Sequence, residues 1–272
     1  MKFIKYHGTG NDFIFVNDKN IDESQLPEIA KKVCHRFFGI GADGLMMAGE
    51  STKADIKMNY YNQDGSVAPM CGNGLRCFGR YVHETGILAK ERFMVETLAG
   101  ILSVDVSRGY NDIVIDLNKP TYMLDYPDTV HPLTNGNSIS LVVNGREYKM
   151  DVLFLGTLHG IILTADKVPD EDAYALCHHE FFPKRINVNF VQILDRKNIQ
   201  LRTYERGVGY TLACGTGAAS SQVIAHKKGL TDEKVKVHVD GGELIVLIAD
   251  SVILSGPAVK VATGEIILEN IG

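Results

Sequence analysis

Two cysteines each open a short segment of the form C-G-x-G. The sequence reads Cys71-Gly72-Asn73-Gly74 in its first half and Cys214-Gly215-Thr216-Gly217 in its second. A helix is predicted to begin at each segment, and the start of a helix presents unpaired backbone N–H groups that stabilise a thiolate and attract anions. The glycines let a ligand approach the backbone closely. Each segment therefore predicts a reactive thiol beside an anion-binding site.

The presence of two such thiols favours one kind of chemistry. Two helix starts directed at one ligand would bind a carboxylate from both sides and present a thiol to each face of the neighbouring carbon. One thiol would remove the α-proton of an amino acid and the other would return a proton to the opposite face. A free thiol has a pKa of about 8.5, so the site must lower one thiol pKa and keep the partner protonated. The pattern predicts racemisation or epimerisation.

An internal repeat organises the chain around these segments. The offset that superposes Cys71 on Cys214 also superposes Tyr61 on Tyr204 and Gly86 on Gly229. Further upstream, Gly8-Thr9 and Gly156-Thr157 each precede an apolar run at a similar offset. Self-similarity of this kind indicates a duplicated unit.

The hydrophobic patterns predict the same elements in both halves. Apolar residues spaced as on one helix face predict a helix from about Gly74 to Thr85, and its counterpart runs from about Gly217 to Lys228. Runs rich in β-branched and aromatic residues predict the strands. These strands are Phe13–Val16, Lys57–Asn62, Phe93–Thr97 and Ile101–Val106 in the first half, and Ile161–Thr164, Asn198–Glu205, Val235–Val239 and Glu243–Ile248 in the second.

These elements predict an α+β fold with two pseudo-symmetric, mostly β domains, each wrapped around a central helix, and a cleft between them. The first domain is predicted to span residues 1–118, completed by a C-terminal strand at 263–272. The second is predicted to span residues 119–262, with a hinge at Asn118 to Pro120.

Composition excludes several classes of protein. The 272 residues carry 28 Lys and Arg against 33 Asp and Glu, for a net charge of −5, so no basic surface for nucleic acid is predicted. The longest apolar run, Leu244–Ala249, is far shorter than the roughly 20 residues that span a membrane. The N-terminus lacks a signal-peptide pattern, which predicts a cytoplasmic protein. The five cysteines form no C-x-x-C pair, so neither a disulfide framework nor a metal site is predicted.

Two long motifs resemble the signatures of the diaminopimelate epimerase family. These are M-C-G-N-G-x-R-C at Met70 to Cys77 and E-R-G-x-G-x-T-x-A-C-G-T-G at Glu205 to Gly217. The similarity extends to H-G-x-G-N-D-F at His7 to Phe13 and G-x-G-A-D-G at Gly39 to Gly44. The resemblance implies an isomerase that needs no pyridoxal phosphate or other cofactor. It would convert L,L-diaminopimelate to the meso isomer for lysine and peptidoglycan synthesis, and it would be a homodimer.

The resemblance also implies a role for each matching residue. Cys71 and Cys214 would be the acid and base. His159 would tune thiol ionisation, and Thr157 would be a second supporting residue. The remaining matches would bind substrate. Those at the α-carboxylate would be Gly72, Asn73, Gly215 and Thr216, and those around the amino groups and the distal carboxylate would be Asn11, Asn62, Asn187, Glu205 and Arg206.

Departures from the family pattern keep two alternatives open. Family members often have Asn-Pro where this chain has Thr157-Leu158, and Glu where it has Pro69 and Tyr210. One alternative is therefore a cofactor-independent racemase of another amino acid on the same scaffold. The other is a thiol-disulfide switch in which Cys71 and Cys214 form a bond.

Three further features are interpreted as structural. The G-x-G-x-x-G pattern at Gly39 to Gly44 lacks a preceding strand and a following helix, so a dinucleotide site is not predicted. Cys177-His178-His179 resembles a set of metal ligands, but neighbouring residues of a helix point in different directions. Cys34, Cys77 and Cys177 have no glycine partner and are predicted to lie in the core.

Overall fold

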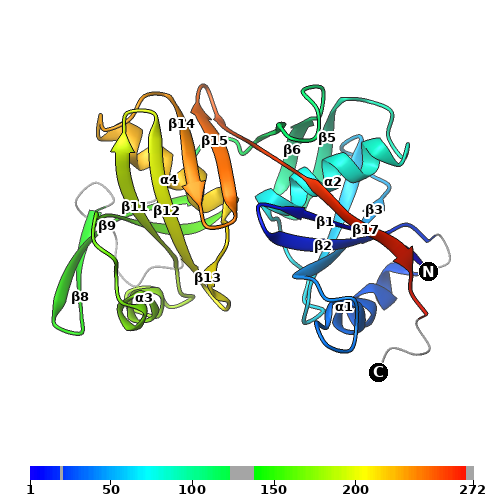
Figure 1. Ribbon diagram of the computed structural model, residues 1–272, viewed down its shortest axis with the longest axis horizontal. Helices are drawn as coiled ribbons and strands as arrows, with labels where there is room; N and C mark the ends of the chain where they lie inside the picture. Colours follow the sequence, from blue (N-terminus) through cyan, green and yellow to red (C-terminus); the bar gives the residue numbers. More distant parts are fainter. Residues whose placement is uncertain (19–20, 123–137, 268–272) are drawn as a thin grey trace. The chain divides into compact units, whose positions relative to one another are not determined.

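The computed structural model describes residues 1–18, 21–122 and 138–267 (Figure 1). The chain divides into two compact units. Unit 1 comprises Met1–Asp116 together with the residues from Ser255 onward, and unit 2 comprises Leu117–Leu254. Each unit has its own sheet and its own hydrophobic core. In the part of the chain that the structure describes, no helix is long and apolar enough to cross a membrane.

The described residues of unit 1 form strands, two α-helices and one 3-10 helix, η1. Its elements are β1 (Lys2–Gly8), β2 (Asn11–Val16), η1 (Glu23–Gln25), α1 (Leu26–Cys34), β3 (Gly44–Gly49), β4 (Ile56–Asn62), α2 (Gly72–Glu84), β5 (Arg92–Thr97), β6 (Gly100–Asp105), β7 (Ile113–Asp116) and β17 (Val259–Glu265).

Outside residues 123–137, unit 2 repeats this plan with its own strands and two α-helices. Its elements are β8 (Ser138–Val143), β9 (Arg146–Leu155), β10 (Thr157–Leu163), α3 (Asp170–Cys177), β11 (Asn187–Asp195), β12 (Asn198–Glu205), β13 (Gly209–Thr211), α4 (Gly215–Lys227), β14 (Lys234–Val239) and β15 (Gly242–Ile248). The boundary between the units falls within β16 (Val252–Gly256).

The two sheets have the same strand order and the same strand directions. In unit 1 the strand order is β17-β1-β2-β3-β4-β5-β6. The pairs β2–β3 and β4–β5 are parallel, and the other neighbouring pairs in this order are antiparallel. In unit 2 the order β8-β9-β10-β11-β12-β14-β15 has the same succession of pairs. This correspondence confirms the predicted pseudo-symmetric, mostly β fold. It also identifies β17, from the C-terminal end, as the counterpart of β8.

A long helix packs against the sheet of each unit. In unit 1, α2 contacts β1, β2, β6 and β7, and in unit 2, α4 contacts β9, β10, β11, β12 and β15. Residues Ala218 to Ala225 of α4 are all buried, because small side chains allow close packing on every face. Both helices begin at the C-G-x-G segments, so packing on the sheet fixes the position of each cysteine.

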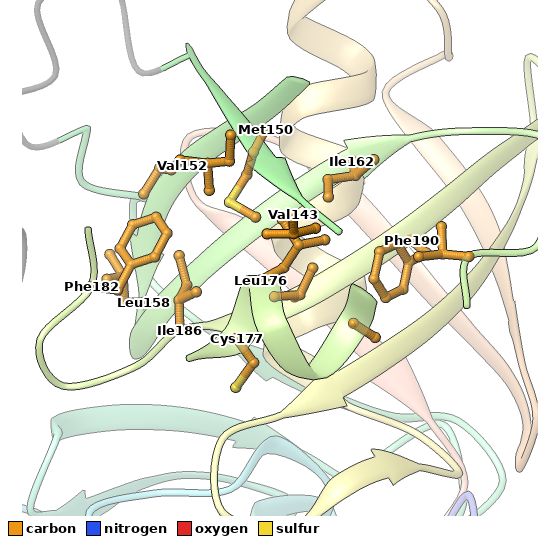
Figure 2. Close-up of a cluster of buried hydrophobic side chains, with 14 residues drawn as sticks. Val143, Met150, Val152, Leu158, Ile162, Leu176, Cys177, Phe182, Ile186 and Phe190 are labelled. Atoms are coloured by element: carbon orange, nitrogen blue, oxygen red, sulfur yellow. The ribbon is translucent and has the colours of Figure 1, made fainter. Parts of the chain in front are cut away.

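A shorter helix covers a second face of each sheet. In unit 1, α1 buries one side of the helix, including Ile29 and Val33, against β3 and β4. In unit 2, α3 buries Leu176 and Cys177 in a cluster with strand side chains that include Met150, Leu158 and Phe190 (Figure 2). Burial of such apolar side chains contributes roughly 1.5–3 kcal/mol each to folding.

The predicted elements are present, with small differences at their ends. Both predicted helices begin two residues earlier than expected, at Gly72 and Gly215, because Cys71 and Cys214 already have the extended conformation of an N-cap. The C-terminal part of the chain differs more. Residues 255–262 were assigned to the second domain, but the structure places them in unit 1, where β17 pairs with β1. Part of the predicted 263–272 strand, residues 268–272, lies outside the described residues.

Candidate active site

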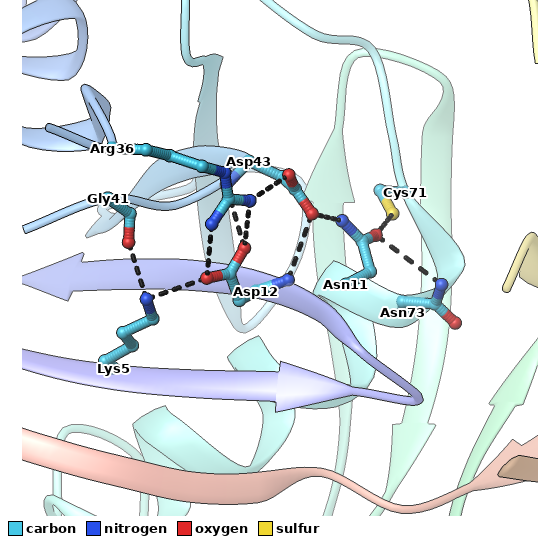
Figure 3. Close-up of polar contacts among 8 residues, drawn as sticks. All are labelled: Lys5, Asn11, Asp12, Arg36, Gly41, Asp43, Cys71 and Asn73. Atoms are coloured by element: carbon cyan, nitrogen blue, oxygen red, sulfur yellow. Dashed lines mark hydrogen bonds and ion pairs between the residues drawn. The ribbon is translucent and has the colours of Figure 1, made fainter. Parts of the chain in front are cut away.

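Cys71 occupies the N-cap of α2. Its backbone is extended, with φ −141° and ψ 124°, and the Gly74 N–H donates to Sγ at 3.5 Å. A Cβ at Gly74 would lie 2.3 Å from the Met46 methyl carbon, so a side chain there requires the end of Met46 to move. The thiol of Cys71 donates in turn to Oδ1 of Asn11 at 3.3 Å (Figure 3). This contact joins the predicted site residues Asn11 and Cys71.

A network of hydrogen bonds and ion pairs fixes the side chain of Asn11. Its Nδ2 donates to the Asp43 carboxylate at 2.5 Å, and Arg36 pairs with the same carboxylate at 2.7 Å. Arg36 and Lys5 both pair with Asp12, at 2.9 and 2.7 Å. The pKa of Asp12 is lowered despite its partial burial, because Arg36 and Lys5 donate to its carboxylate. The amide of Asn11 therefore has a fixed orientation, with Oδ1 toward the sulfur (Figure 3).

Arg76 supports the first turn of α2 from inside unit 1. Its side chain is completely buried and donates to Oδ1 of Asn73 at 3.0 Å and to the carbonyls of Gly72 and Pro257. Burial lowers the pKa of Arg76. Thr9 also donates to Oδ1 of Asn73, at 3.4 Å. Arg76 thus orients two predicted carboxylate-binding residues, Gly72 and Asn73.

Cys214 occupies the N-cap of α4 in unit 2. Its backbone is extended, with φ −118° and ψ 110°, and its Sγ lies 3.7 Å from Oγ1 of Thr216. Gly217 cannot carry a side chain, because a Cβ there would lie 2.4 Å from Oδ1 of Asn189 and 3.2 Å from the Cys214 sulfur. The predicted residues Cys214, Gly215 and Thr216 thus form one helix start, as their counterparts do in unit 1.

His159 lies behind Thr216, in β10. It is completely buried, and its Nε2 is 3.0 Å from Oγ1 of Thr216. Its Nδ1 is 3.1 Å from Nδ2 of Asn189, which also donates to the Gly160 carbonyl. Burial, with a smaller contribution from the charge on Arg206, lowers the pKa of His159 to about 3. The imidazole is therefore neutral at physiological pH.

Arg206 follows β12 and extends toward the start of β10. Its guanidinium donates to Oγ1 of Thr157 at 3.2 Å and to the Lys184 carbonyl at 3.4 Å. Its backbone N–H donates to Oδ1 of the buried Asn187 at 3.0 Å. Thr157, Asn187 and Arg206 thus lie together in unit 2. The neighbouring Glu205 accepts from the Thr211 hydroxyl at 2.6 Å.

Asn62 is placed differently from Asn11. It ends β4, and both its side chain and its backbone N–H donate to Ser66, at 3.0 and 2.8 Å. These bonds close the turn that precedes α2. These hydrogen bonds are those of a turn residue, and the substrate-binding role of Asn62 stays a prediction.

Tyr210 and Pro69, which depart from the family pattern, make local contacts. Tyr210 packs on the unit 2 core, with its ring 5.2 Å from that of Tyr204 and 4.2 Å below the guanidinium carbon of Arg202. Pro69 is exposed, and its carbonyl accepts from the Ala99 N–H. Neither side chain takes part in the hydrogen bonds described above for the predicted site residues.

The other cysteines lie in the core, as predicted. Cys34, Cys77 and Cys177 are completely buried, and burial raises the pKa of each thiol, to about 12 for Cys34 and Cys77. Among the described residues, no three His, Cys, Asp or Glu side chains gather as metal ligands. Gly39 to Gly44 leads into strand β3 rather than into a helix, so its geometry differs from that of a dinucleotide loop.

Two residues of the site were missed by the sequence interpretation. Asp43 fixes Asn11, and Asn189 fixes His159. Asp43 lies inside the quoted G-x-G-A-D-G motif, and Asn189 lies on the same face of β11 as Asn187, two residues away. The sequence contained both signals, but Asp43 and Asn189 are far along the chain from Asn11 and His159, which they contact.

The fold places the chain in a known structural class. It shares its fold with a Bacillus anthracis phenazine biosynthesis protein of the PhzF family, with a TM-score of 0.71 and 16% identity over 98% of this chain and 99% of that one. It also matches a hydroxyproline epimerase from Agrobacterium vitis, with a TM-score of 0.69 and 13% identity over 97% and 91% of the two chains.

Sequence similarity then identifies the family. The family described as diaminopimelate epimerase matches residues 3–123 and 156–268. A diaminopimelate epimerase of Alkaliphilus metalliredigens is 41% identical over 97% of this chain and 96% of its own length. One of Clostridium perfringens is 42% identical over 92% and 93%. The chain belongs to the diaminopimelate epimerase family and is an isomerase.

Proposed function

We propose that this chain interconverts L,L- and meso-diaminopimelate without pyridoxal phosphate, in lysine and peptidoglycan biosynthesis. The observation that carries the proposal is the duplicated half-site, in which Cys71 and Cys214 each cap a helix buried against its own sheet. Full-length relatives named diaminopimelate epimerase support the assignment. Mechanistically, the two half-sites act on opposite faces of one α-carbon.

The helix starts supply the carboxylate site. Backbone N–H groups of the first turns, at Gly72, Asn73, Gly215 and Thr216, donate to the α-carboxylate. These groups are fixed by the helices, so they need no reorganisation as negative charge develops beside the carboxylate. The α-proton of an amino acid is a very weak acid, and preorganised donors of this kind lower the barrier to its removal.

The two cysteines carry the proton transfers. A thiolate takes the α-proton from one face, which leaves a carbanion stabilised by the bound carboxylate. The other thiol then donates its proton to the opposite face, which inverts the centre and reverses the protonation states of the pair. The reverse reaction exchanges their roles.

Arg206 provides recognition of a second carboxylate. Its planar guanidinium has the fork geometry that binds carboxylates, and Thr157 holds it in place at 3.2 Å. Thr157 thereby supplies a polar contact at a position where relatives often have Asn. Asn11, Asn62, Asn187 and Glu205 complete the proposed contacts to the amino groups and the distal end. A dicarboxylic substrate follows from this arrangement.

A substrate comparison with reduced protein tests the proposal. Free of pyridoxal phosphate and under thiol reductant, the chain should convert L,L-diaminopimelate to the meso isomer, measured by chiral chromatography. Monocarboxylic amino acids should react at a kcat/KM at least about a hundredfold lower, because they lack the partner of Arg206. Comparable turnover of a monocarboxylic amino acid would favour the racemase alternative. No turnover of any amino acid by reduced protein would favour the thiol-disulfide switch.

Two finer expectations accompany this function. A homodimer is the proposed assembly, and the cytoplasm is the proposed location, because diaminopimelate is a biosynthetic intermediate in this proposal. Sedimentation of the purified chain tests the first of these. Nucleic acid and membranes are not proposed partners.

A further inference from the structure

A groove of about 300 Å³ opens in unit 2 at the C-terminal end of α4. Its walls come from the last turns of α4, the turn between β15 and β16, and the chain segment that enters unit 2. The volume lies at the lower end of the range for small-molecule pockets, so it suits a ligand about the size of an amino acid. Because the 13 residues of α4 extend for about 20 Å, the groove is separate from Cys214 at the other end of the helix.

Part of the groove lining is apolar. This part is formed by Val223 of α4, Ile248 at the end of β15, Val252 at the start of β16, and Pro120. Val223 and Val252 are buried, and Ile248 is half-buried. An aliphatic chain that contacts these side chains is removed from water, which favours its binding. These residues therefore fit the hydrocarbon part of a ligand.

Lys227 supplies a positive charge to the groove. Its Nζ lies 4.1 Å from the centre of the Tyr122 ring, and this cation–π contact holds the ammonium group over another residue of the lining. Among the described residues, no carboxylate pairs with Lys227, whereas the adjacent Lys228 pairs with Asp151 at 3.1 Å. The charge of Lys227 is therefore available to an anionic group of a ligand.

His226 and Asp250 supply hydrogen-bond acceptors to the same groove. Nδ1 of His226 lies 3.1 Å from the Thr231 carbonyl, which can only accept, so Nδ1 carries the proton and Nε2 of the neutral imidazole is an acceptor. Asp250 lies in the turn between β15 and β16, and its exposed side chain forms no ion pair within the part of the chain that the structure describes. The partial negative charge at the C-terminus of α4 adds to these acceptors. Together they favour a bound ammonium group.

We propose that this groove binds a free α-amino acid with an unbranched aliphatic side chain, whose carboxylate pairs with Lys227 and whose ammonium group is bound by Asp250 and His226. A ligand with only a negative charge would lie beside the Asp250 carboxylate, and one with only a positive charge would lie beside Lys227. A zwitterion satisfies both groups, and the apolar residues take up its side chain. This second amino-acid site does not depend on the proposed function.

Methyl NMR of the full chain tests the proposal. With isotopically labelled Ile and Val methyl groups, L-norleucine should produce saturable shifts of Ile248 and Val252, which line the groove. Hexanoate lacks the ammonium group and pentylamine lacks the carboxylate, so each should bind at least about tenfold more weakly than norleucine. Equal affinity of the three compounds, or no shift of these methyl groups, would overturn the proposal.

Lys227→Met tests the binding of the carboxylate. The variant keeps an apolar stem but removes the charge, so the affinity for norleucine should fall about tenfold while that for pentylamine does not fall. Lys228→Met is the matched control, because Lys228 is the next residue along the chain and pairs with Asp151 outside the groove lining. The control should bind norleucine as the parent does. An unchanged affinity in Lys227→Met, or an equal fall in the control, would refute the role of Lys227.

Asp250→Asn and Ala249→Phe test the rest of the groove. Asp250→Asn should weaken norleucine severalfold without weakening hexanoate, which has no ammonium group. Ala249→Phe places a ring at an exposed position of the lining and should abolish the shifts, and a folded variant that binds norleucine normally would contradict the assignment. The shifts of the parent should persist after iodoacetamide alkylation of Cys71 and Cys214, and their loss would mean that norleucine binds at the candidate active site instead. None of these readouts requires turnover, so their failure is distinguishable from failure of the proposed function.

Discussion

His159 shows how burial sets the chemistry of a single residue. The imidazole is completely buried between Thr216 and Asn189, and its pKa is lowered from 6.5 to about 3 mainly by desolvation. The folded protein therefore holds His159 neutral, whereas the unfolded chain binds a proton there below about pH 6.5. From pH 6.5 down to about 3, this difference lowers the free energy of unfolding by about 1.4 kcal/mol per pH unit.

His159→Gln should remove this pH dependence. The glutamine amide can still donate to Thr216, but it takes up no proton in the unfolded chain. The stability advantage of the parent over the variant should therefore shrink by about 2–3 kcal/mol between pH 7 and pH 4.5. Urea unfolding followed by tyrosine fluorescence measures it. A constant difference across this pH range would show that His159 is not held neutral by the fold.

The sequence predicted the positions of the cysteines but not the orientations of Asn11 and His159. The glycine neighbours of Cys71 and Cys214 predicted that both lie at helix starts, and they do. The cysteines without such neighbours lie in the core, as predicted. The orientations of Asn11 and of His159 depend on Asp43 and Asn189, which contact them only after folding. Sequence patterns report faces and spacings, but they do not report which partner orients an amide or an imidazole.

At the scale of elements, the two helix starts have the same form but different surroundings. Gly74 of α2 faces Met46, whose methyl end is flexible, and Gly217 of α4 faces Oδ1 of Asn189. Asn189 is buried and fixed by hydrogen bonds to Thr203 and to the Gly160 carbonyl, so it cannot move without losing them. The glycine is therefore more strictly required at the start of α4.

Gly217→Ala and Gly74→Ala form a matched pair that tests this difference. Gly217→Ala should lower the free energy of unfolding by about 2–3 kcal/mol, because its Cβ displaces a buried, hydrogen-bonded amide. Gly74→Ala should cost about 1 kcal/mol or less, since Met46 can change rotamer. Chemical denaturation of the two variants measures the difference. The expectation fails if Gly74→Ala is as destabilising as Gly217→Ala.

Most elements were predictable because their patterns are local. Periodicity located α2 and α4 and the strands on either side of them. The hairpin β8–β9 was not predicted, although its Asn144-Gly145 turn, with φ of 50° and 78°, is a strong hairpin signal. The pairing of β17 with β1 could not be read from local pattern, because it joins the two ends of the chain. Comparison of the two repeats reveals the pairing of β17 with β1.

At the scale of the whole molecule, the duplication explains why one chain carries two cysteines at helix starts. Each unit has its own sheet, core and helix start, so each cysteine is positioned independently by its own half. The same strand order then supports two different networks behind the sulfurs.

The isotope content of the product tests the two-thiol claim most directly. L,L-diaminopimelate is incubated with reduced protein in heavy water, and the reaction is stopped at low conversion. With a separate thiol on each face, the meso isomer should carry deuterium at the inverted α-carbon by NMR, while recovered L,L substrate stays largely unlabelled. A meso product that retains the original hydrogen would mean that one group removes and returns the same proton, and it would contradict the account.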